Sequence, residues 1–407
     1  MREAKVALLA TMIWLGSAVA LHGQNGEPVE IARAYTVSST ILGEDRPVQV
    51  ALPLEYDTAQ AYPVVYVLDG PGHLVHTTGT VRFLAANGRM PAAIVVAIAN
   101  TPGNRTRDLT PPPGEDDDSF DTAGGASRFQ AFLRDELKPW VESRYSTRPY
   151  DVLVGHSFGG LFIAHVLNTE PSLFDAYVAI SPSLWWADES FVAGLDDVFE
   201  RFPDTHGALY MTMGNEGGAM ISGAWHLAGT LEKSAPSSFR WHWKPMPTET
   251  HGSVPARSTY DGLEWIFSGW YPIQLMDDLA QRGASELPRL ETHFTELSAE
   301  FGWEVAPPVN DLVNTVHQMV ERGRTDDAMA IAARTVEWFP ANAYARFGLG
   351  QAHMGACRWN EAEEHHTRAL DMAEAEDPNG GLADFIRGEL SELRKKAAAA
   401  DRCEPGA

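Results

Sequence analysis

The stretch Tyr150–Leu167, YDVLVGHSFGGLFIAHVL, decides the fold. Its first six residues suit a buried strand, and the residues after Gly160 suit a helix, with only the glycines around Ser157 between the two. Glycine adopts backbone conformations that other residues avoid, and a serine kept only for packing needs no such neighbours. The stretch therefore predicts a sharp strand-to-helix bend that presents one serine, and later residues are expected to act with it.

Apolar runs rich in β-branched residues alternate with helical patterns in the first half of the chain. One helical pattern, Ser127–Tyr145, places its large apolar residues on one face. The later strand runs lack apolar–polar alternation, as expected when helices cover both faces of a sheet. The sequence therefore predicts an α/β fold with a mostly parallel sheet. The strand runs are Pro47–Pro53, Tyr62–Gly70, Ala92–Asn100, Tyr150–Gly155, Phe174–Ser183 and Gly207–Asn215.

Three residues of catalytic type follow strand runs in chain order, namely Ser157, Glu216 and His251. Sites of parallel sheets form at the carboxyl ends of the strands. The order serine, acid, histidine and the pattern G-x-S-x-G are those of α/β-hydrolases. A histidine takes the proton of the serine hydroxyl, and a carboxylate orients and stabilises that histidine. We therefore predict Ser157 as nucleophile, His251 as base and Glu216 as acid, with the amide of Phe158 free to stabilise an oxyanion.

Alternatives exist for each of these residues. The chain has 14 histidines, and His251 is preferred because it lies in a loop before an amphipathic helix. Asp188 and Glu249 are rival acids, although Glu249 lies only two residues before the histidine. A tight packing turn is the alternative role for Ser157, and a solvated turn residue is the alternative for Glu216.

Composition limits the classes of partner. The chain has 407 residues, 44% of them hydrophobic, which suits two or three globular domains. Its net charge of −24 argues against nucleic acid and anionic membrane partners, because those require basic surface. Cys357 and Cys403 are too few for a disulfide scaffold or a cysteine-rich metal site, and whether they pair stays open. No metal-binding motif is visible.

The N-terminus has the pattern of a secretory signal. Arg2 and Lys5 precede an apolar run, Val6–Ala20, that ends in small residues. We therefore expect a removable signal peptide, a periplasmic or secreted protein, and no integral membrane span after removal of the signal. An uncleaved N-terminal anchor is the alternative.

The chain after Trp270 changes character. A helical connector ends at two prolines, and two helix pairs follow in which Ala328 and Ala362 occupy matching contexts 34 residues apart. That spacing is the tetratricopeptide period, although about three repeats are usually needed for a free-standing solenoid. We therefore expect these helices to pack against the preceding domain or against a second copy of the chain, with peptide binding as the alternative role.

The run of motifs resembles a known family. Val67–Gly70 (VLDG), Arg105–Pro111 (RTRDLTP), the GHSFGGLF bend and Ser181–Trp186 (SPSLWW), followed by GNE and HGSVP, resemble the putative esterase family of α/β-hydrolases. Within it they are most similar to the branch of siderophore (trilactone) esterases. The resemblance covers about Val37–Trp270 and, with the features above, divides the chain as follows: signal peptide 1–20, α/β-hydrolase esterase domain 30–270, helical connector 271–308, tetratricopeptide-like helix pairs 309–376, and C-terminal helix with polar tail 377–407.

The resemblance implies a serine carboxylesterase that acts on small-molecule esters without a cofactor. It implies Phe158 and Gly70 as oxyanion donors, and it places Arg107, Trp185 and Trp186 near the mouth, where a cation and aromatic walls suit a polar aromatic ester. An ion pair in a loop is the alternative for the arginine, and core packing is the alternative for the tryptophans. Relatives act on feruloyl, acetylxylan, formylglutathione and mycolyl esters, so the substrate does not follow from the fold.

Two functions of different classes follow from these features. The first is an exported serine esterase that works through an acyl-enzyme. The second is a catalytically silent hydrolase scaffold whose tetratricopeptide-like region mediates binding or assembly. The sequence favours the first, because all three triad residue types stand at the expected strand ends.

Overall fold

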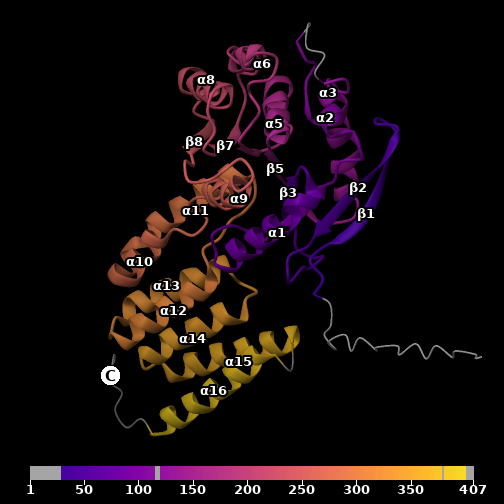
Figure 1. Ribbon diagram of the computed structural model, residues 1–407. Helices are drawn as coiled ribbons and strands as arrows, with labels where there is room; N and C mark the ends of the chain where they lie inside the picture. Colours follow the sequence, from indigo (N-terminus) through magenta and orange to yellow (C-terminus); the bar gives the residue numbers. More distant parts are fainter. Residues whose placement is uncertain (1–28, 115–119, 378–379, 400–407) are drawn as a thin grey trace, which may run out of the picture. The chain divides into compact units, whose positions relative to one another are not determined.

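The computed structural model of the protein describes residues 29–114, 120–377 and 380–399 (Figure 1). The helices and strands below belong to one unit of the described chain, which begins at Ala32.

An eight-stranded sheet with strand order β1-β2-β4-β3-β5-β6-β7-β8 forms the centre of the N-terminal part of the described chain. β1 pairs antiparallel with β2 and β2 with β4, whereas the pairs from β4 through β3 to β8 are parallel. The expected α/β class with a mostly parallel sheet is therefore confirmed. The strands are β1 (Arg33–Ser39), β2 (Glu44–Ala51), β3 (Tyr62–Val67), β4 (Ile94–Ile98), β5 (Thr147–His156), β6 (Ala176–Ile180), β7 (Gly207–Met213) and β8 (Phe239–Pro245).

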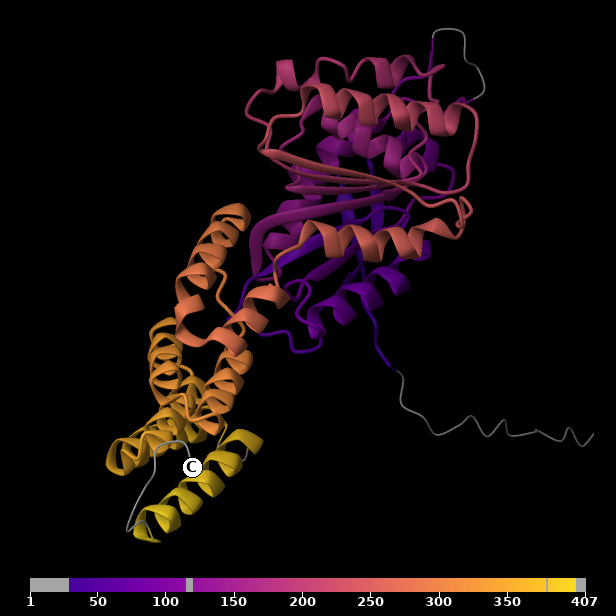
Figure 2. The same cartoon turned by 90° about the vertical axis from the view of Figure 1, so that its left-hand side faces the viewer.

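Helices cover both faces of the sheet, and Figure 2 shows the sheet nearly edge-on between them. α1 (Gly70–Ala86) and α9 (Val254–Ile266) contribute to the apolar cluster on one face, and α5 (Phe158–Thr169) and α8 (Ala219–Ser234) to the cluster on the other. Alternate residues of each central strand enter the two clusters, because successive side chains of a strand point to opposite faces. This sandwiching explains why the central strands are apolar throughout.

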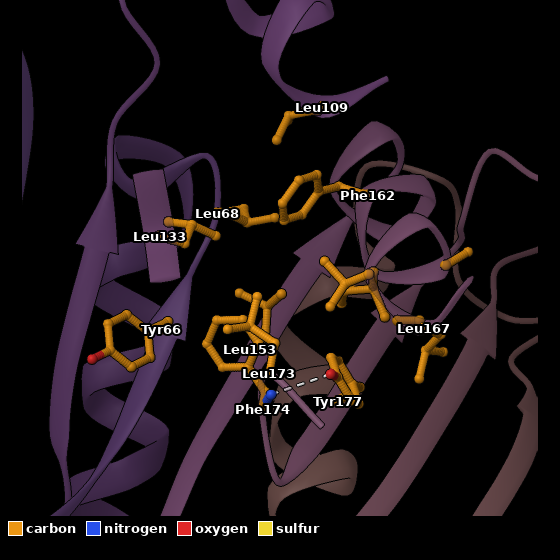
Figure 3. Close-up of a cluster of buried hydrophobic side chains, with 14 of the residues drawn as sticks. Tyr66, Leu68, Leu109, Leu133, Leu153, Phe162, Leu167, Leu173, Phe174 and Tyr177 are labelled. Atoms are coloured by element: carbon orange, nitrogen blue, oxygen red, sulfur yellow. Dashed lines mark hydrogen bonds between the residues drawn. The ribbon is translucent and has the colours of Figure 1, made fainter. Parts of the chain in front are cut away.

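The core between the sheet and α5 contains the buried Tyr177, whose hydroxyl is hydrogen-bonded (Figure 3). The Tyr177 hydroxyl donates to the Pro171 carbonyl at 2.9 Å and accepts from the Phe174 amide at 3.2 Å. A buried hydroxyl without partners would destabilise the fold, so these bonds let a large polar aromatic residue occupy the core.

The helix expected at 127–145 is divided. Its first part is α3 (Ala126–Phe132) and its last part is α4 (Lys138–Glu142), with a π-helical turn, Leu133–Leu137, between them. Pro139 lies in the first turn of α4 and has no backbone N–H to donate to the preceding turn. The wider turn accommodates this missing hydrogen bond.

Helices make up the rest of the described chain. The three short ones are α2 (Arg105–Leu109), α6 (Ser190–Ala193) and α7 (Val198–Arg201). The C-terminal ones are α10 (Ile273–Arg282), a 3-10 turn (Gly283–Glu286), α11 (Leu287–Phe301), α12 (Val309–Glu321), α13 (Thr325–Trp338), α14 (Ala343–Gly355), α15 (Trp359–Glu376) and α16 (Gly381–Ala399).

The apolar core of the C-terminal helices is continuous with the core on the α1–α9 face of the sheet. Leu312 and Val316 of α12, which the sequence shows as an apolar stripe, are fully buried in the same cluster as Phe267 and Phe301. Arg334 of α13 also forms an ion pair with Glu291 of α11 at 2.7 Å. These helices therefore bury their stripes within the chain itself.

The two cysteines, the expected signal peptide and the question of a membrane span involve residues that the structure describes only in part or not at all. Cys357 is disulfide-bonded, and Cys403, the other cysteine of the chain, lies outside the described residues. The expected signal at 1–20 also lies outside them. Within the described ranges, no helix has both the length and the apolar character that crossing a membrane requires.

A buried carboxylate makes fold stability depend on pH. Burial, only partly offset by an ion pair with Lys138 at 2.8 Å, raises the pKa of Asp151 to about 6. The folded state therefore binds a proton more tightly than the unfolded state, and this group stabilises the fold less as pH rises from about 4 to about 6. Asp151→Asn should remove the part of the stability change that this group causes, so the decrease in unfolding free energy between pH 5 and pH 8 should be smaller by about 1.4 kcal/mol in the variant. Urea denaturation at both pH values measures it, and the exposed Asp204→Asn is the control, expected to match the wild type.

Candidate active site

The bend after β5 holds Ser157 in a strained conformation. Ser157 has φ 61° and ψ −116°, a region that residues other than glycine rarely occupy, and its amide donates to the Ile180 carbonyl at 2.9 Å. A Cβ at Gly155 would lie 2.3 Å from the carbonyl oxygen of Gly159, and one at Gly160 would lie 2.8 Å from Pro182. The glycines are therefore required by close approach of the backbone, and the strand-to-helix bend expected from the sequence is present.

Gly155→Ala should destabilise the fold. The added methyl group would meet backbone atoms that cannot move without breaking the start of α5, so we expect a loss of about 3 kcal/mol in unfolding free energy. The matched control is Gly229→Ala in α8, whose added methyl group meets no atom within 4 Å and which should stabilise the helix by up to about 1 kcal/mol. Urea denaturation of both variants measures the difference, and equal stabilities would contradict this interpretation of the bend.

The Glu216 carboxylate and the His251 ring are hydrogen-bonded. Nδ1 of His251 lies 2.8 Å from Oε2 of Glu216. The other carboxylate oxygen of Glu216 accepts from the Ser181 hydroxyl at 2.6 Å, and Ser181 Oγ in turn accepts from the Gly214 amide at 3.0 Å. A carboxylate has no hydrogen to donate, so the Ser181 hydroxyl is the donor in its bond to Glu216, and this chain of hydrogen bonds holds Glu216 in one orientation.

The rival acids lie elsewhere. The Glu249 carboxylate accepts from the Ser253 hydroxyl at 2.7 Å, and the Glu249 carbonyl accepts from the Asn215 amide at 2.6 Å. Asp188 lies in a turn after the SPSLWW motif, where it has φ 50°. Of the three acids considered, Glu216 is the one whose carboxylate contacts His251.

A second histidine packs on His251. The ring of His156, which precedes Ser157, has its centroid 4.5 Å from that of His251 and 5.7 Å from that of His73. Burial, together with the neighbouring histidines His251 and His73, lowers the pKa of His156 to about 4. Above that pH His156 is neutral, so it places no positive charge beside His251 when His251 accepts a proton. This contact also brings His251 to the residue next to the serine.

The Ser157 hydroxyl has a second serine as its hydrogen-bond partner. Ser157 Oγ lies 3.4 Å from Ser183 Oγ, and the Ser183 amide donates to the Ser157 carbonyl at 3.2 Å. The His251 side chain is 42% exposed, which leaves its ring accessible to solvent and to a substrate.

The two residues expected to bind an oxyanion are the first residues of neighbouring helices. Gly70 begins α1 after β3, and Phe158 begins α5 after β5, and these two strands are adjacent in the sheet. N–H groups in the first turn of a helix have no acceptor within the helix. A Cβ at Gly70 would lie 2.8 Å from the Ala97 backbone, so only glycine fits there. Both amides therefore lie at the carboxyl edge of the sheet that also carries Ser157.

Arg105 reaches the bend, where its guanidinium donates to the His156 carbonyl at 3.5 Å, whereas the sequence places Arg107 near the mouth. Arg107 forms ion pairs with Asp108 at 2.7 Å and Glu44 at 3.0 Å, as the loop-pair alternative described. Arg105 binds both carboxylate oxygens of Asp69, at 2.7 and 2.8 Å, and its guanidinium lies 5.4 Å from the centre of the Phe158 ring. It is 38% exposed and is thus the cation available at the mouth.

Aromatic rings gather beside the bend. Phe158 lies 6.2 Å from Trp185 and 5.6 Å from Trp186, and Phe120 lies within 6.2 Å of all three rings. Trp186 is fully buried and donates to the Pro112 carbonyl, so its role is in the core. Trp185 is partly exposed and forms, with Phe158 and Phe120, an aromatic wall next to Ser157.

Sequence reasoning missed several residues of this site. Ser181, Ser183 and Arg105 all lie within motifs quoted above, but nothing in a single sequence separates them from their neighbours. Among the residues that the structure describes, no three His, Cys, Asp or Glu side chains gather as a metal site would require.

Comparisons with known proteins agree with this architecture. Residues 39–224 match the model of the family described as Putative esterase, and residues 319–379 match a tetratricopeptide repeat model. The chain is 34% identical over 158 residues to the siderophore triacetylfusarinine C esterase of Aspergillus fumigatus. This match covers 35% of this chain and 53% of that protein. The chain is 33% identical over 157 residues to the ferri-bacillibactin esterase of Bacillus subtilis, which covers 34% and 53%. The chain thus matches about half the length of these relatives.

Solved structures share the fold. An IroE-like serine hydrolase from Shewanella oneidensis is 29% identical with a TM-score of 0.62, covering 75% of this chain and 99% of its own. A protein from Capnocytophaga ochracea, 18% identical with a TM-score of 0.63, covers 89% of this chain and 99% of its own, and it shows the fold alone. Residues 39–224, which include most of the sheet, thus match the family described as Putative esterase, the described fold is of the α/β-hydrolase type, and residues 319–379 match a tetratricopeptide repeat.

Proposed function

We propose that this protein is a serine esterase that hydrolyses carboxylic esters through Ser157, His251 and Glu216. The observation that carries the proposal is the strained Ser157 beside the hydrogen-bonded pair of His251 and Glu216. A serine hydroxyl is a weak nucleophile until a base takes its proton, and this base already has the carboxylate that stabilises its cation.

The first half of the proposed reaction forms an acyl-enzyme. Ser157 Oγ bonds to the ester carbonyl carbon while His251 Nε2 takes the hydroxyl proton, and the carbonyl electron pair moves to its oxygen. The first amides of α1 and α5, at Gly70 and Phe158, stabilise that oxyanion. The electron pair then returns, the bond to the alcohol oxygen breaks, and the alcohol leaves with the proton from His251.

The second half regenerates the enzyme. Water attacks the acyl carbon and gives one proton to His251, the same two amides hold the new oxyanion, and the bond to Ser157 Oγ breaks. Oγ takes the proton back from His251, and the carboxylic acid is released. The fixed orientation of Glu216 keeps His251 Nε2 free to act as acceptor in each attack.

The substrate class that we propose is a siderophore-type ester with aromatic acyl or side groups. Phe158, Phe120 and the exposed face of Trp185 offer aromatic walls, and Arg105 offers a cation for phenolate or carboxylate groups. The printed names of the relatives, which are esterases of siderophores, favour the same class. We further propose that residues 1–20 are a signal peptide and that the enzyme acts in the periplasm or outside the cell.

A substrate panel tests this proposal. The purified protein would be assayed with a catecholate trilactone, methyl ferulate and p-nitrophenyl esters of increasing acyl length. We expect kcat/KM for the trilactone to exceed that for p-nitrophenyl acetate by at least about 100-fold, since remote aromatic groups add binding energy in the transition state. A preference for the simple acetate would contradict the substrate class, and no turnover of any ester would favour the silent scaffold.

A further inference from the structure

A groove lined by three tryptophans lies at the edge of the sheet, away from every residue placed in the esterase site. It has a volume of about 490 Å³ and is lined by residues of α8 and of the edge strand β8. Trp241 and Trp243 of β8 form one wall, and Trp225 of α8 forms the other. The Trp225 and Trp243 rings meet edge to face, with centroids 5.6 Å apart and planes at 76°.

Four residues of α8 line the groove, and the two in the middle, Ala228 and Gly229, are small. Trp225, Ala228, Gly229 and Glu232 are spaced i, i+3, i+4 and i+7, so they share one face of α8. Ala228 is buried, and a Cβ at Gly229 would meet no atom within 4 Å. Trp225 is 55% exposed although it is the largest residue type in the chain. The hollow between the rings is therefore open to solvent.

The charge of the groove is negative. Glu232 is exposed, and within the described chain its carboxylate has no ion-pair partner. The side chain of His242, the other titratable lining residue, stacks on Tyr210 and Trp265 on the opposite face of the sheet. The net charge of −24 further favours cations over anions near this surface.

We propose that this groove binds a quaternary ammonium group, such as the trimethylammonium head of choline. Such a cation has no N–H to donate, so it needs only aromatic faces and a nearby carboxylate, and this groove offers both. A polyol would need a hydrogen-bond partner for each of several hydroxyls, and the lining side chains facing the groove supply only indole N–H groups and one carboxylate. An anion would be repelled by Glu232.

Calorimetric titration of the full chain with choline at low salt tests the proposal. We expect a Kd of about 1 mM or below, as several cation–π contacts would give. Trp225→Ala should weaken binding about tenfold and Glu232→Gln about threefold, because each removes one cation contact. Phe83→Ala, an exposed aromatic residue on α1 outside the groove, is the control and should change nothing.

Gly229→Leu separates loss of the site from loss of the fold. Leucine is a better helix former than glycine, so the variant should fold, and its side chain would fill the hollow and abolish choline binding. Ester hydrolysis should be unchanged, because no groove residue belongs to the esterase site. Choline affinity equal to that of the wild type in this variant would overturn the proposal.

Two further comparisons complete the test. The neutral isostere 3,3-dimethylbutan-1-ol should bind at least about tenfold more weakly than choline, and equal affinity would overturn the proposal in favour of a merely apolar groove. Vesicles of phosphatidylcholine and of phosphatidylglycerol distinguish a lipid headgroup from a free solute, and choline-headgroup selectivity supports the site in either form. A dimer in light scattering that Trp225→Ala converts to monomer would instead assign the groove to a second copy of this chain.

Discussion

Replacing Ser157 with alanine is expected to lower kcat for ester hydrolysis by about 10⁴- to 10⁶-fold, because the covalent route is lost and only binding and oxyanion stabilisation remain. The fold should be retained, since the hydroxyl makes one hydrogen bond of 3.4 Å and Cβ is unchanged. Steady-state kinetics with a p-nitrophenyl ester measures the loss, and circular dichroism checks the fold.

The matched control for this variant is Ser183→Ala. Ser183 is the hydrogen-bond partner of the Ser157 hydroxyl but is given no covalent role, so its removal should cost less than about tenfold in kcat. A Ser157→Ala protein that keeps activity within tenfold of the wild type would show that the nucleophile is another residue.

Glu216→Gln is expected to lower kcat by about 10³- to 10⁴-fold. The Ser181 hydroxyl donates to Glu216 and accepts from the Gly214 amide, and a glutamine at position 216 preserves this arrangement only if its oxygen faces Ser181. The glutamine oxygen would therefore face Ser181, and its NH₂ group would face His251 Nδ1. Donation to Nδ1 places the imidazole proton on Nε2, and His251 then has no lone pair with which to take the proton of Ser157.

Glu249→Gln is the control that separates the two acids. Its carboxylate contacts the Ser253 hydroxyl and not His251, so kcat should stay within about threefold of the wild type. The same esterase assay measures both variants. An equal loss in the two variants, or a larger loss for Glu249→Gln, would reassign the acid.

Local patterns predicted the sheet and the bend. Buried strands appear in the sequence as continuous apolar runs. The bend is marked by its glycines, because a Cβ at these positions would lie 2.3 to 2.8 Å from backbone atoms of nearby residues. β1 was not predicted, because it is an edge strand with exposed residues at its start and offers no apolar run. The π-helical turn was missed because periodicity alone does not register the absent N–H of Pro139.

Contacts between distant segments were beyond the sequence. Arg105 and Arg107 lie two residues apart on a short helix, and only the positions of Asp69 and Glu44 decide which one reaches the bend. The Ser181 bond to Glu216 joins residues 35 positions apart. The apolar stripe of α12, Leu312 and Val316, is visible in the sequence because its residues are close together in the chain. The residues that cover it, among them Phe267 and Phe301, are distant in the chain and could not be identified from the sequence.

Stoichiometric labelling with a fluorophosphonate tests the central claim, that Ser157 is an activated nucleophile. The probe phosphonylates a serine only where a base takes the hydroxyl proton and an oxyanion site stabilises the adduct. Mass spectrometry of the intact wild-type chain should show one adduct per chain, with activity lost in proportion. After digestion, mass spectrometry of the Tyr150–Leu167 region should locate that adduct on Ser157. An unlabelled protein, or one labelled on another residue while Ser157 stays free, would contradict the account.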